Sequence, residues 1–263
     1  PLSVVSMEGA LEGWLTAIGL RPDTLMPSVR FGLESALVKC ASTILGHTEF
    51  GAVHVNGLLS SEPAHVLEDA ESLVLRGFRG IKLKVGRARV EDDIEMVRLV
   101  SERFGSSLIL RCDANRSWTL DEALAFAKGV SGFEIEFIEE PVKDLADLKA
   151  FCELSSIPVA LDEHLSDHLQ GTTLENVVEE TALLLDSFAE SLDAAVLKPA
   201  VLGSIEKFKA VVDVCSRRGI KPIDRLICNA GVYQPSLPYA KWSADGHEQT
   251  MQINFLSHFL MIR

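Results

Sequence analysis

Ile81-Lys82-Leu83-Lys84-Val85 is the stretch of this sequence that most restricts the possible folds. Aliphatic and lysine residues alternate in it with the period of two that is typical of a β-strand. This period places Lys82 and Lys84 on the same face, with both ammonium groups pointing into one interior. Crowding two cations is expected to lower their pKa, and a lysine brought towards neutrality can act first as a general base and then as a general acid.

Around this stretch, short apolar or β-branched runs alternate with longer segments of helical periodicity. The alternation predicts βα units around a parallel sheet. Strands are expected over residues 53–58, 81–85, 108–112, 137–138, 159–161 and 195–197, and helices over residues 63–76, 90–104, 120–130, 145–154 and 204–217. Thr119 followed by Glu122 predicts an N-cap, and Gly219 predicts a helix stop.

Ionisable residues end the predicted strands one after another. Periodicity alone fits both a closed TIM barrel and an open doubly wound sheet, but a barrel carries its chemistry at the carboxyl ends of its strands. The pattern therefore favours a barrel. The strand-end residues are Lys82 and Lys84, then Asp113, Glu139, Asp162 and Lys198.

Lysine amines and three carboxylates are thus expected at one rim. Three oxygen ligands suit a hard divalent cation such as Mg2+. A carbon acid beside a carboxylate is weak because its conjugate base concentrates negative charge, and a dication that binds this carboxylate stabilises the enediolate. Lys198, approaching from the opposite side, can add a second positive charge.

The order Lys-x-Lys, Asp-Ala-Asn, Glu-Glu-Pro, Asp-Glu and Val-x-Lys-Pro resembles the muconate-lactonizing branch of the enolase superfamily. Residues 113–118 (Asp-Ala-Asn-Arg-Ser-Trp) and 27–34 (Pro-Ser-Val-Arg-Phe-Gly-Leu-Glu) are most similar to o-succinylbenzoate synthase, including the form fused into a phylloquinone-pathway enzyme of photosynthetic eukaryotes. The similarity spans about residues 26–202.

The resemblance implies a magnesium-dependent lyase that removes an α-proton and then dehydrates its substrate in syn fashion. The partner it implies is a small carboxylate substrate. Racemase, epimerase and cycloisomerase activities occur on the same scaffold and stay open. The resemblance also implies a role for each site residue: magnesium ligands Asp113, Glu139 and Asp162; acid/base Lys84; electrostatic neighbour Lys82; enediolate stabiliser Lys198; supporting residues Asn115 and Arg111.

Composition excludes several other classes. The formal net charge is −13 and Lys and Arg do not cluster, which disfavours a nucleic-acid surface. No apolar run reaches the roughly 18 to 20 residues of a membrane span. The five cysteines are scattered, so neither a disulfide framework nor a thiolate zinc site is expected. We expect an intracellular soluble protein, chloroplast-located in a photosynthetic eukaryote and otherwise cytoplasmic.

The family pattern stops after about Pro222. Residues 223–231 (Ile-Asp-Arg-Leu-Ile-Cys-Asn-Ala-Gly) and 254–260 resemble a piece of a short-chain dehydrogenase. No Gly-rich dinucleotide fingerprint precedes them, and Tyr233 and Tyr239 have no Lys four positions on, so no cofactor-binding residues are assigned.

The expected organisation is α/β, with an incomplete TIM-type barrel. It comprises a capping-domain remnant over 1–48, a partial enolase-type barrel over 49–222 and a foreign α/β tail over 223–263. The chain begins at Pro1 rather than Met, as a processed chain or a fragment would. An inactive truncated or chimeric fragment is therefore an alternative to the lyase, and a nicotinamide-dependent oxidoreductase is a third.

Overall fold

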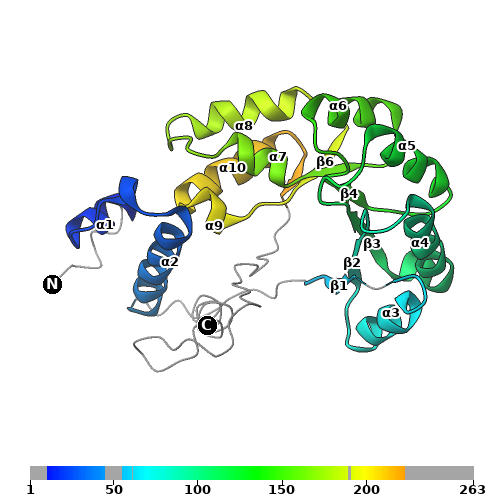
Figure 1. Ribbon diagram of the computed structural model, residues 1–263. Coiled ribbons are helices and arrows are strands. Elements are labelled where there is room, and N and C mark those ends of the chain that lie inside the picture. The colour runs from blue at the N-terminus through cyan, green and yellow to red at the C-terminus, as the bar shows by residue number, and fades with distance from the viewer. Residues whose placement is uncertain (1–10, 45–54, 61, 189–190, 223–263) are drawn as a thin grey trace, which may run out of the picture. The chain divides into compact units, whose positions relative to one another are not determined.

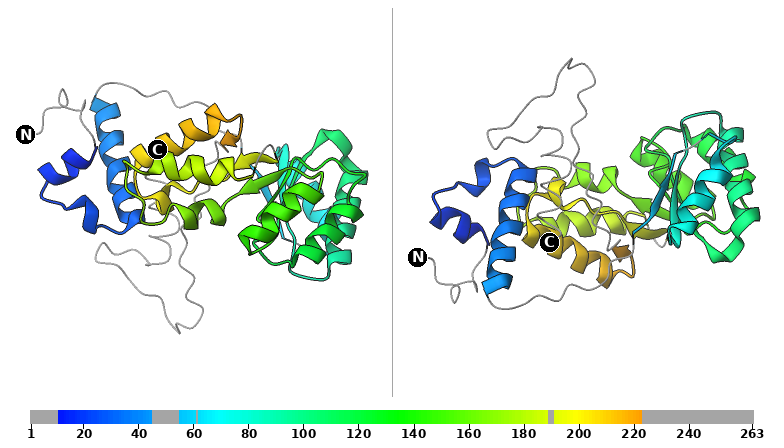
Figure 2. Two further views of the ribbon diagram at one scale, coloured as in Figure 1. Left: turned by 90° about the horizontal axis from the view of Figure 1, so that it is seen from above. Right: turned by 90° about the horizontal axis from the view of Figure 1, so that it is seen from below.

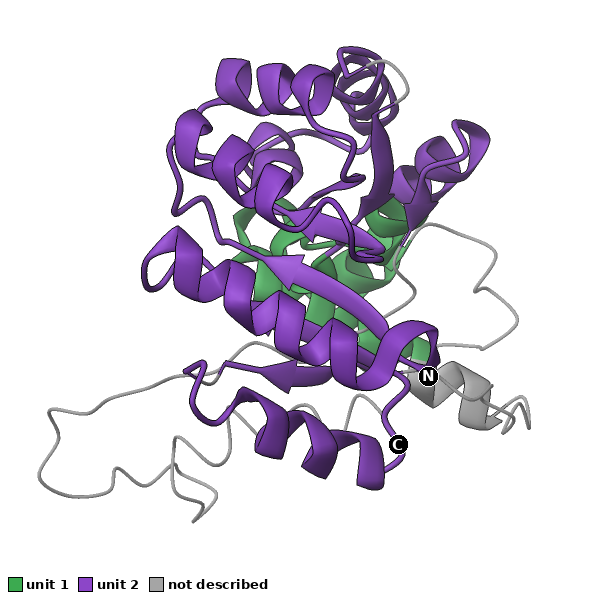
Figure 3. Ribbon diagram, turned by 90° about the vertical axis from the view of Figure 1, so that its right-hand side faces the viewer, with its two compact units in different colours: residues 1–52, 198–209, 226–263 green, residues 53–197, 210–225 purple. Residues whose placement is uncertain are grey.

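The computed structural model describes residues 11–44, 55–60, 62–188 and 191–222 (Figure 1). It contains two compact units (Figure 3). Of the described residues, 11–44 and 198–209 belong to the first unit, and those between 55 and 197 together with 210–222 belong to the second. The tail over 223–263, for which the resemblance to a short-chain dehydrogenase was stated, lies outside the described residues. The expected domain boundaries at 48 and 222 fall within or beside such segments, and they stay predictions.

The second unit is built on a sheet of seven parallel strands that follow one another in chain order. A doubly wound sheet reverses its strand order at a switch point, whereas a barrel does not. The unreversed order, with β1 and β7 as the two edges, confirms the prediction of an incomplete barrel. The strands are β1 (Gly57–Leu59), β2 (Gly80–Lys84), β3 (Ile109–Asp113), β4 (Phe137–Glu139), β5 (Val159–Leu161), β6 (Leu192–Ala195) and β7 (Lys221–Pro222).

Helices that connect the strands lie on the outer side of this sheet (Figure 1). Successive helices from α3 to α6 pack against one another. The helices associated with this sheet are α3 (Val66–Leu75), α4 (Val90–Phe104), η3 (Gly105–Ser107), α5 (Leu120–Gly129), α6 (Leu145–Leu154), α7 (Glu163–His168), α8 (Val177–Asp186) and α10 (Ile205–Arg217).

The predicted N-cap at Thr119 is confirmed as a complete capping box. The Thr119 side chain accepts a hydrogen bond from the Glu122 amide at 3.3 Å, and Glu122 Oε2 accepts one from the Thr119 amide at 2.8 Å. These bonds satisfy two of the amide groups that a helix start leaves without partners. Trp118, just before this helix, packs on Phe126 within it, with ring centroids 4.6 Å apart.

Alternation in β2 separates its two kinds of side chain. Ile81 and Leu83 are fully buried, and Cys112 in the neighbouring strand is buried too. Lys82 and Lys84 lie on the other face, as the period of two predicts. The aliphatic face thus fills the core and leaves the lysine face for the site.

Several elements differ from the sequence prediction. β6 begins at Leu192 rather than residue 195, because backbone pairing with β5 and not the apolar run fixes the strand. In the second unit, α7, α8 and β7 were not expected, and β7 has only two residues.

The first unit consists of helices in its described part: α1 (Leu11–Ala17), η2 (Pro22–Thr24), α2 (Pro27–Ile44), α9 (Pro199–Leu202) and the first turn of α10. Figure 2 shows α2 in blue beside α9 in yellow, and the two helices are in contact. No helix in the described ranges is both long and apolar enough to cross a membrane.

Candidate active site at the carboxyl ends of the strands

Strand register brings three of the predicted site residues into one row. Lys84 at the end of β2 lies opposite Asp113 at the end of β3, and Asp113 lies opposite Glu139 at the end of β4. Backbone bonds continue the ladder past this row, since Val85 N–H donates to the Asp113 carbonyl at 3.0 Å. Asp113 and Glu139 are each only 1% exposed. The row is thus held by the sheet itself.

The lysine amines bind these carboxylates directly. Lys82 Nζ lies 2.6 Å from Asp113 Oδ2 and 2.8 Å from Glu139 Oε2, so it bridges two strands. Lys84 Nζ donates to Asp113 Oδ2 and to Asn115 Oδ1, both at 2.6 Å. The Asn115 amide in turn donates to Asp113 Oδ1 at 3.0 Å. Asn115 therefore contacts both the acid and the amine.

Asn115 and Arg116 have positive φ angles of 46° and 60°, which non-glycine residues seldom adopt. Asparagine tolerates this region better than most residues because its short side chain can bond locally. The turn after β3 thereby brings the Asn115 amide back onto the preceding carboxylate. Such local strain is typical of functional sites.

The electrostatics of the cluster correct one expectation. Burial lowers the pKa of Lys82, but the charges of Glu139 and Asp113 outweigh it and raise that pKa above its ordinary value. The expected lowering by a crowded neighbouring lysine is therefore wrong for Lys82. Lys82 stays protonated at neutral pH because two carboxylates, and not a second cation, are its closest charged partners.

The two carboxylates respond in opposite directions. Burial strongly raises the pKa of Glu139, and the charges of Asp113 and Asp162 add to the rise against the opposing effect of Lys82. Burial also raises the pKa of Asp113, but Lys82 and Lys84 outweigh it and the net pKa is lowered. Asp113 is therefore the firmly ionised member of the pair.

Glu140 organises the ends of β4 and β5. Its carboxylate is fully buried, and its Oε1 accepts hydrogen bonds from the amides of Asp162 at 2.7 Å and His164 at 3.0 Å. Its Oε2 contacts His164 Nδ1 and accepts from Arg116 Nε at 2.9 Å. Three loops thus meet on one side chain. Asp162, 2% exposed, has its own amide fixed by this contact.

The sequence pattern did not identify this set of residues as a network. The strand-end pattern assigns no role to Glu140 or His164. His164 is buried, and Arg116 additionally binds Asp167 at 2.6 Å. The available signal was position alone, since Glu140, His164 and Arg116 each stand within three positions of a predicted ligand. Nothing in the pattern shows that these side chains meet.

The donor set fits a hard divalent cation in its chemistry. Asp113, Glu139 and Asp162 are buried, they lie at the ends of adjacent strands, and both aspartates raise the pKa of Glu139. Within the described ranges, however, no three Asp, Glu, His or Cys side chains are already arranged to hold a metal ion. The Lys82 ammonium instead lies between Asp113 and Glu139. A dication bound by these carboxylates would share them with that ammonium.

Lys198 and Arg111 are not part of the row formed by Lys84, Asp113 and Glu139. Lys198 is the N-cap residue of α9, three positions beyond β6, and belongs to the first unit. Its predicted place opposite Lys84 stays a prediction. Arg111 binds Glu136 and Asn56 Oδ1, the latter at 3.0 Å, and its guanidinium lies over the Phe137 ring at 5.1 Å. Arg111 thus supports the interior of the strand.

A buried aspartate closes the loop after β2. Asp93, 1% exposed in the first turn of α4, accepts a hydrogen bond from the Gly86 amide at 2.8 Å. Gly86 has a φ of +77°, and a methyl group there would lie 2.8 Å from Ser117 Cβ. Burial raises the pKa of Asp93 from 3.8 to about 6 against the lowering effect of the Gly86 bond.

We expect this raised pKa to appear in the pH dependence of stability. A carboxyl whose pKa is raised in the folded state binds more protons there than in the unfolded state. Its contribution to the free energy of unfolding therefore falls as pH rises from about 4 to 6. The loss is on the order of 3 kcal/mol. Asp93→Asn should lack that fall, whereas Asp92→Asn, beside it and paired with Arg89, should keep it. Denaturant unfolding at pH 4 to 7 measures this, and equal slopes for wild type and Asp93→Asn would contradict it.

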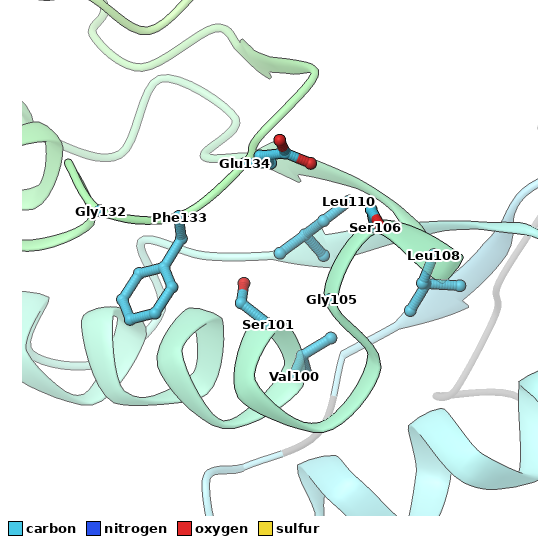
Figure 4. Close-up of a pocket in the computed structure, with 9 residues that line it drawn as sticks. All are labelled: Val100, Ser101, Gly105, Ser106, Leu108, Leu110, Gly132, Phe133 and Glu134. Atoms are coloured by element: carbon cyan, nitrogen blue, oxygen red, sulfur yellow. The ribbon is translucent and has the colours of Figure 1, made fainter.

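A cavity of about 260 Å³ lies away from these residues (Figure 4). Its walls include Leu108 and Leu110, at the amino-terminal end of β3, together with Ser101 of α4 and Phe133. Asp113 lies at the opposite, carboxyl-terminal end of the same strand. The cavity therefore does not belong to the candidate site.

Comparison with known proteins agrees with this arrangement. Residues 65–223 match the enolase C-terminal domain-like family. Protein PHYLLO, chloroplastic, of Arabidopsis thaliana is 34% identical over 235 residues, covering 81% of this chain and 13% of that protein. The o-succinylbenzoate synthase of Proteus mirabilis is 30% identical over 222 residues, covering 82% of this chain and 62% of that protein.

Solved structures show the same likeness. MenC from Desulfotalea psychrophila has a TM-score of 0.64 and 25% identity, covering 81% of this chain and 59% of that chain. Dipeptide epimerases and muconate cycloisomerases are also among the similar proteins. The chain spans about three fifths of the length of the bacterial synthase it matches. Because this family is matched over residues 65–223, which is more than half of the chain, the chain belongs to the enolase superfamily, as a member of its enolase C-terminal domain-like family.

Proposed function

We propose that this chain carries the catalytic residues of a magnesium-dependent carbon–oxygen lyase of o-succinylbenzoate synthase type. The observation that supports this best is the row of Lys84, Asp113 and Glu139 in register at three strand ends. It joins a candidate base to oxygen ligands in one buried place. The proposed substrate is a small carboxylate with an acidic α-hydrogen and a hydroxyl that departs as water.

The two lysines have different roles in this proposal. Lys82 stays cationic because Glu139 and Asp113 raise its pKa, so it acts as a fixed positive charge. Lys84 has one carboxylate and one neutral amide oxygen as partners, and it is the base. Lys84 Nζ takes the α-proton, and the same proton is then delivered to the departing hydroxyl. Water leaves with this proton, the carbon–oxygen bond is broken, and Lys84 returns to its starting state.

Asp113, Glu139 and Asp162 would hold the magnesium ion. When bound, the ion supplies the positive charge that stabilises an enediolate. Glu140 would orient the third ligand by holding the Asp162 amide, and Asn115 would keep Lys84 in reach of the substrate. Lys198 would approach the enediolate from the other side.

Epimerisation is the second candidate function, because dipeptide epimerases are among the similar proteins. Both reactions begin with removal of a proton beside a carboxylate, and they differ in the fate of the enediolate. An epimerase returns a proton to the opposite face of the same carbon, which requires a second acid on that face. The two reactions are therefore distinguished by their products and not by the first step.

The test is product formation with and without the metal. We expect the chain to form o-succinylbenzoate from its hydroxycyclohexadiene precursor when Mg2+ is present, to lose this activity in excess EDTA and to regain it when Mg2+ is restored. L-Ala-L-Glu, assayed in deuterated water, is the epimerase arm. An unchanged rate in EDTA would contradict the metal's role, and no product from the precursor under any condition would reject the lyase.

A further inference from the structure

The segment that begins with Lys198 is fixed by a helix far away in the sequence. We infer that Glu34 of α2 is a positioning residue for Lys198, acting through the turn between α9 and α10. This inference rests on the proposed function in one respect, namely that Lys198 stabilises the enediolate. The contacts themselves lie within the first unit and do not depend on that role.

Glu34 closes the start of α10. Its side chain is fully buried, and its Oε2 accepts a hydrogen bond from the Ile205 amide at 2.7 Å. Ile205 is the first residue of α10, whose opening amides have no partners within the helix. Arg30 Nε, one turn earlier in α2, donates to Glu34 Oε1 at 2.8 Å. Both oxygens of this buried carboxylate are therefore used.

A close backbone approach fixes the same turn. Gly203 has a φ of +77°, and a methyl group on it would lie 2.8 Å from Pro27 Cα, at the start of α2. Any larger residue would push α2 away from the turn. A glycine is therefore needed here both for its backbone angle and for the contact with Pro27.

Backbone hydrogen bonds connect this turn to Lys198. The Lys198 carbonyl accepts hydrogen bonds from the amides of Val201 at 2.9 Å and Leu202 at 3.2 Å, which close the single turn of α9. On the preceding side, the Val196 amide donates to the Leu161 carbonyl at 2.7 Å and ties the chain to β5. The Lys198 backbone thus lies between a strand anchor and a helix anchor. Removal of Glu34 would loosen the second one.

A neighbouring acid offers a matched control. Glu12 of α1 lies 3.7 Å from Arg30 and so shares that partner with Glu34, but its side chain is about half exposed. The Ile205 amide donates to Glu34 and not to Glu12. Glu12→Gln therefore removes a charge beside Arg30 and leaves the cap on Ile205 in place. Glu34→Gln keeps one oxygen that can accept from the Ile205 amide.

Hydrogen exchange and turnover together test the inference. In Glu34→Ala, amides 200–206 should exchange at least tenfold faster. The kcat should fall about ten- to a hundredfold with little change in KM, as expected for a displaced catalytic group. Glu34→Gln should recover most of both effects, and Glu12→Gln should resemble wild type. In a Lys198→Ala background, Glu34→Ala should change kcat less than twofold, because the residue it positions is gone.

Two results would overturn the inference. Unchanged exchange at amides 200–206 in Glu34→Ala would show that the carboxylate does not hold this turn. An equal loss of kcat with and without Lys198 would show a general structural effect and not positioning. Wild type without turnover would reject the proposed lyase function alone, since the exchange measurement still decides whether Glu34 holds the turn.

Discussion

Lys84→Ala is expected to abolish deuterium exchange at the substrate's α-carbon while magnesium binding is retained. A positioned general base contributes about 10²- to 10⁴-fold, so the loss should reach that size. Lys82 still pairs with both Asp113 and Glu139 in the variant, and the strand-end row therefore keeps a positive charge. Exchange measured in deuterated water, with Mg2+ affinity measured by calorimetry, separates the two properties.

Lys221 provides the matched control for this experiment. It is also a strand lysine paired with an aspartate, since its Nζ lies 3.1 Å from Asp193 Oδ1, but it stands in β7 and is largely exposed. Lys221→Ala should exchange at the wild-type rate. If Lys84→Ala also exchanged at the full rate, the base would have to be a different residue.

The strand-end residues could be predicted because one local rule governs them. In parallel strands the carboxyl ends meet at one edge, so the ionisable residue that ends each apolar run must approach its neighbours. Lys84, Asp113 and Glu139 obey that rule, and the register places them opposite one another. Asn115 was predicted for the same reason, because it stands two residues beyond a predicted ligand.

The partners of those residues could not be predicted from a pattern. Alternation placed Lys82 on the correct face but could not show whether its nearest charge is a lysine or a carboxylate on the next strand. The contact with Glu139 joins residues 57 positions apart and raises the pKa that local crowding was expected to lower. β7 was missed for a related reason, since two residues are too few to show any period.

Glu140→Ala should be the most destabilising single substitution at the strand ends. The variant leaves the buried amides of Asp162 and His164 without their acceptor and removes the carboxylate beside Arg116. Breaking a buried, hydrogen-bonded charge pair from one side costs about 3–5 kcal/mol. The free energy of unfolding, measured with guanidinium, should fall by that amount. Glu140→Gln, which keeps one acceptor oxygen, should lose less.

Glu153 of α6 is the control, because it is an exposed glutamate whose replacement by alanine should change stability by less than about 0.5 kcal/mol.

The pH dependence of stability gives a second check on Glu140. Burial raises the pKa of Glu140, but its bonds to His164 and Asp162 outweigh this and lower it overall. A lowered folded pKa contributes stability above the unfolded value and loses it as pH falls through the folded one. The difference in free energy of unfolding between wild type and Glu140→Ala should therefore be largest at pH 7 and become smaller in acid. A difference that stays constant from pH 7 to pH 3 would show that His164 and Arg116 do not bind an ionised carboxylate.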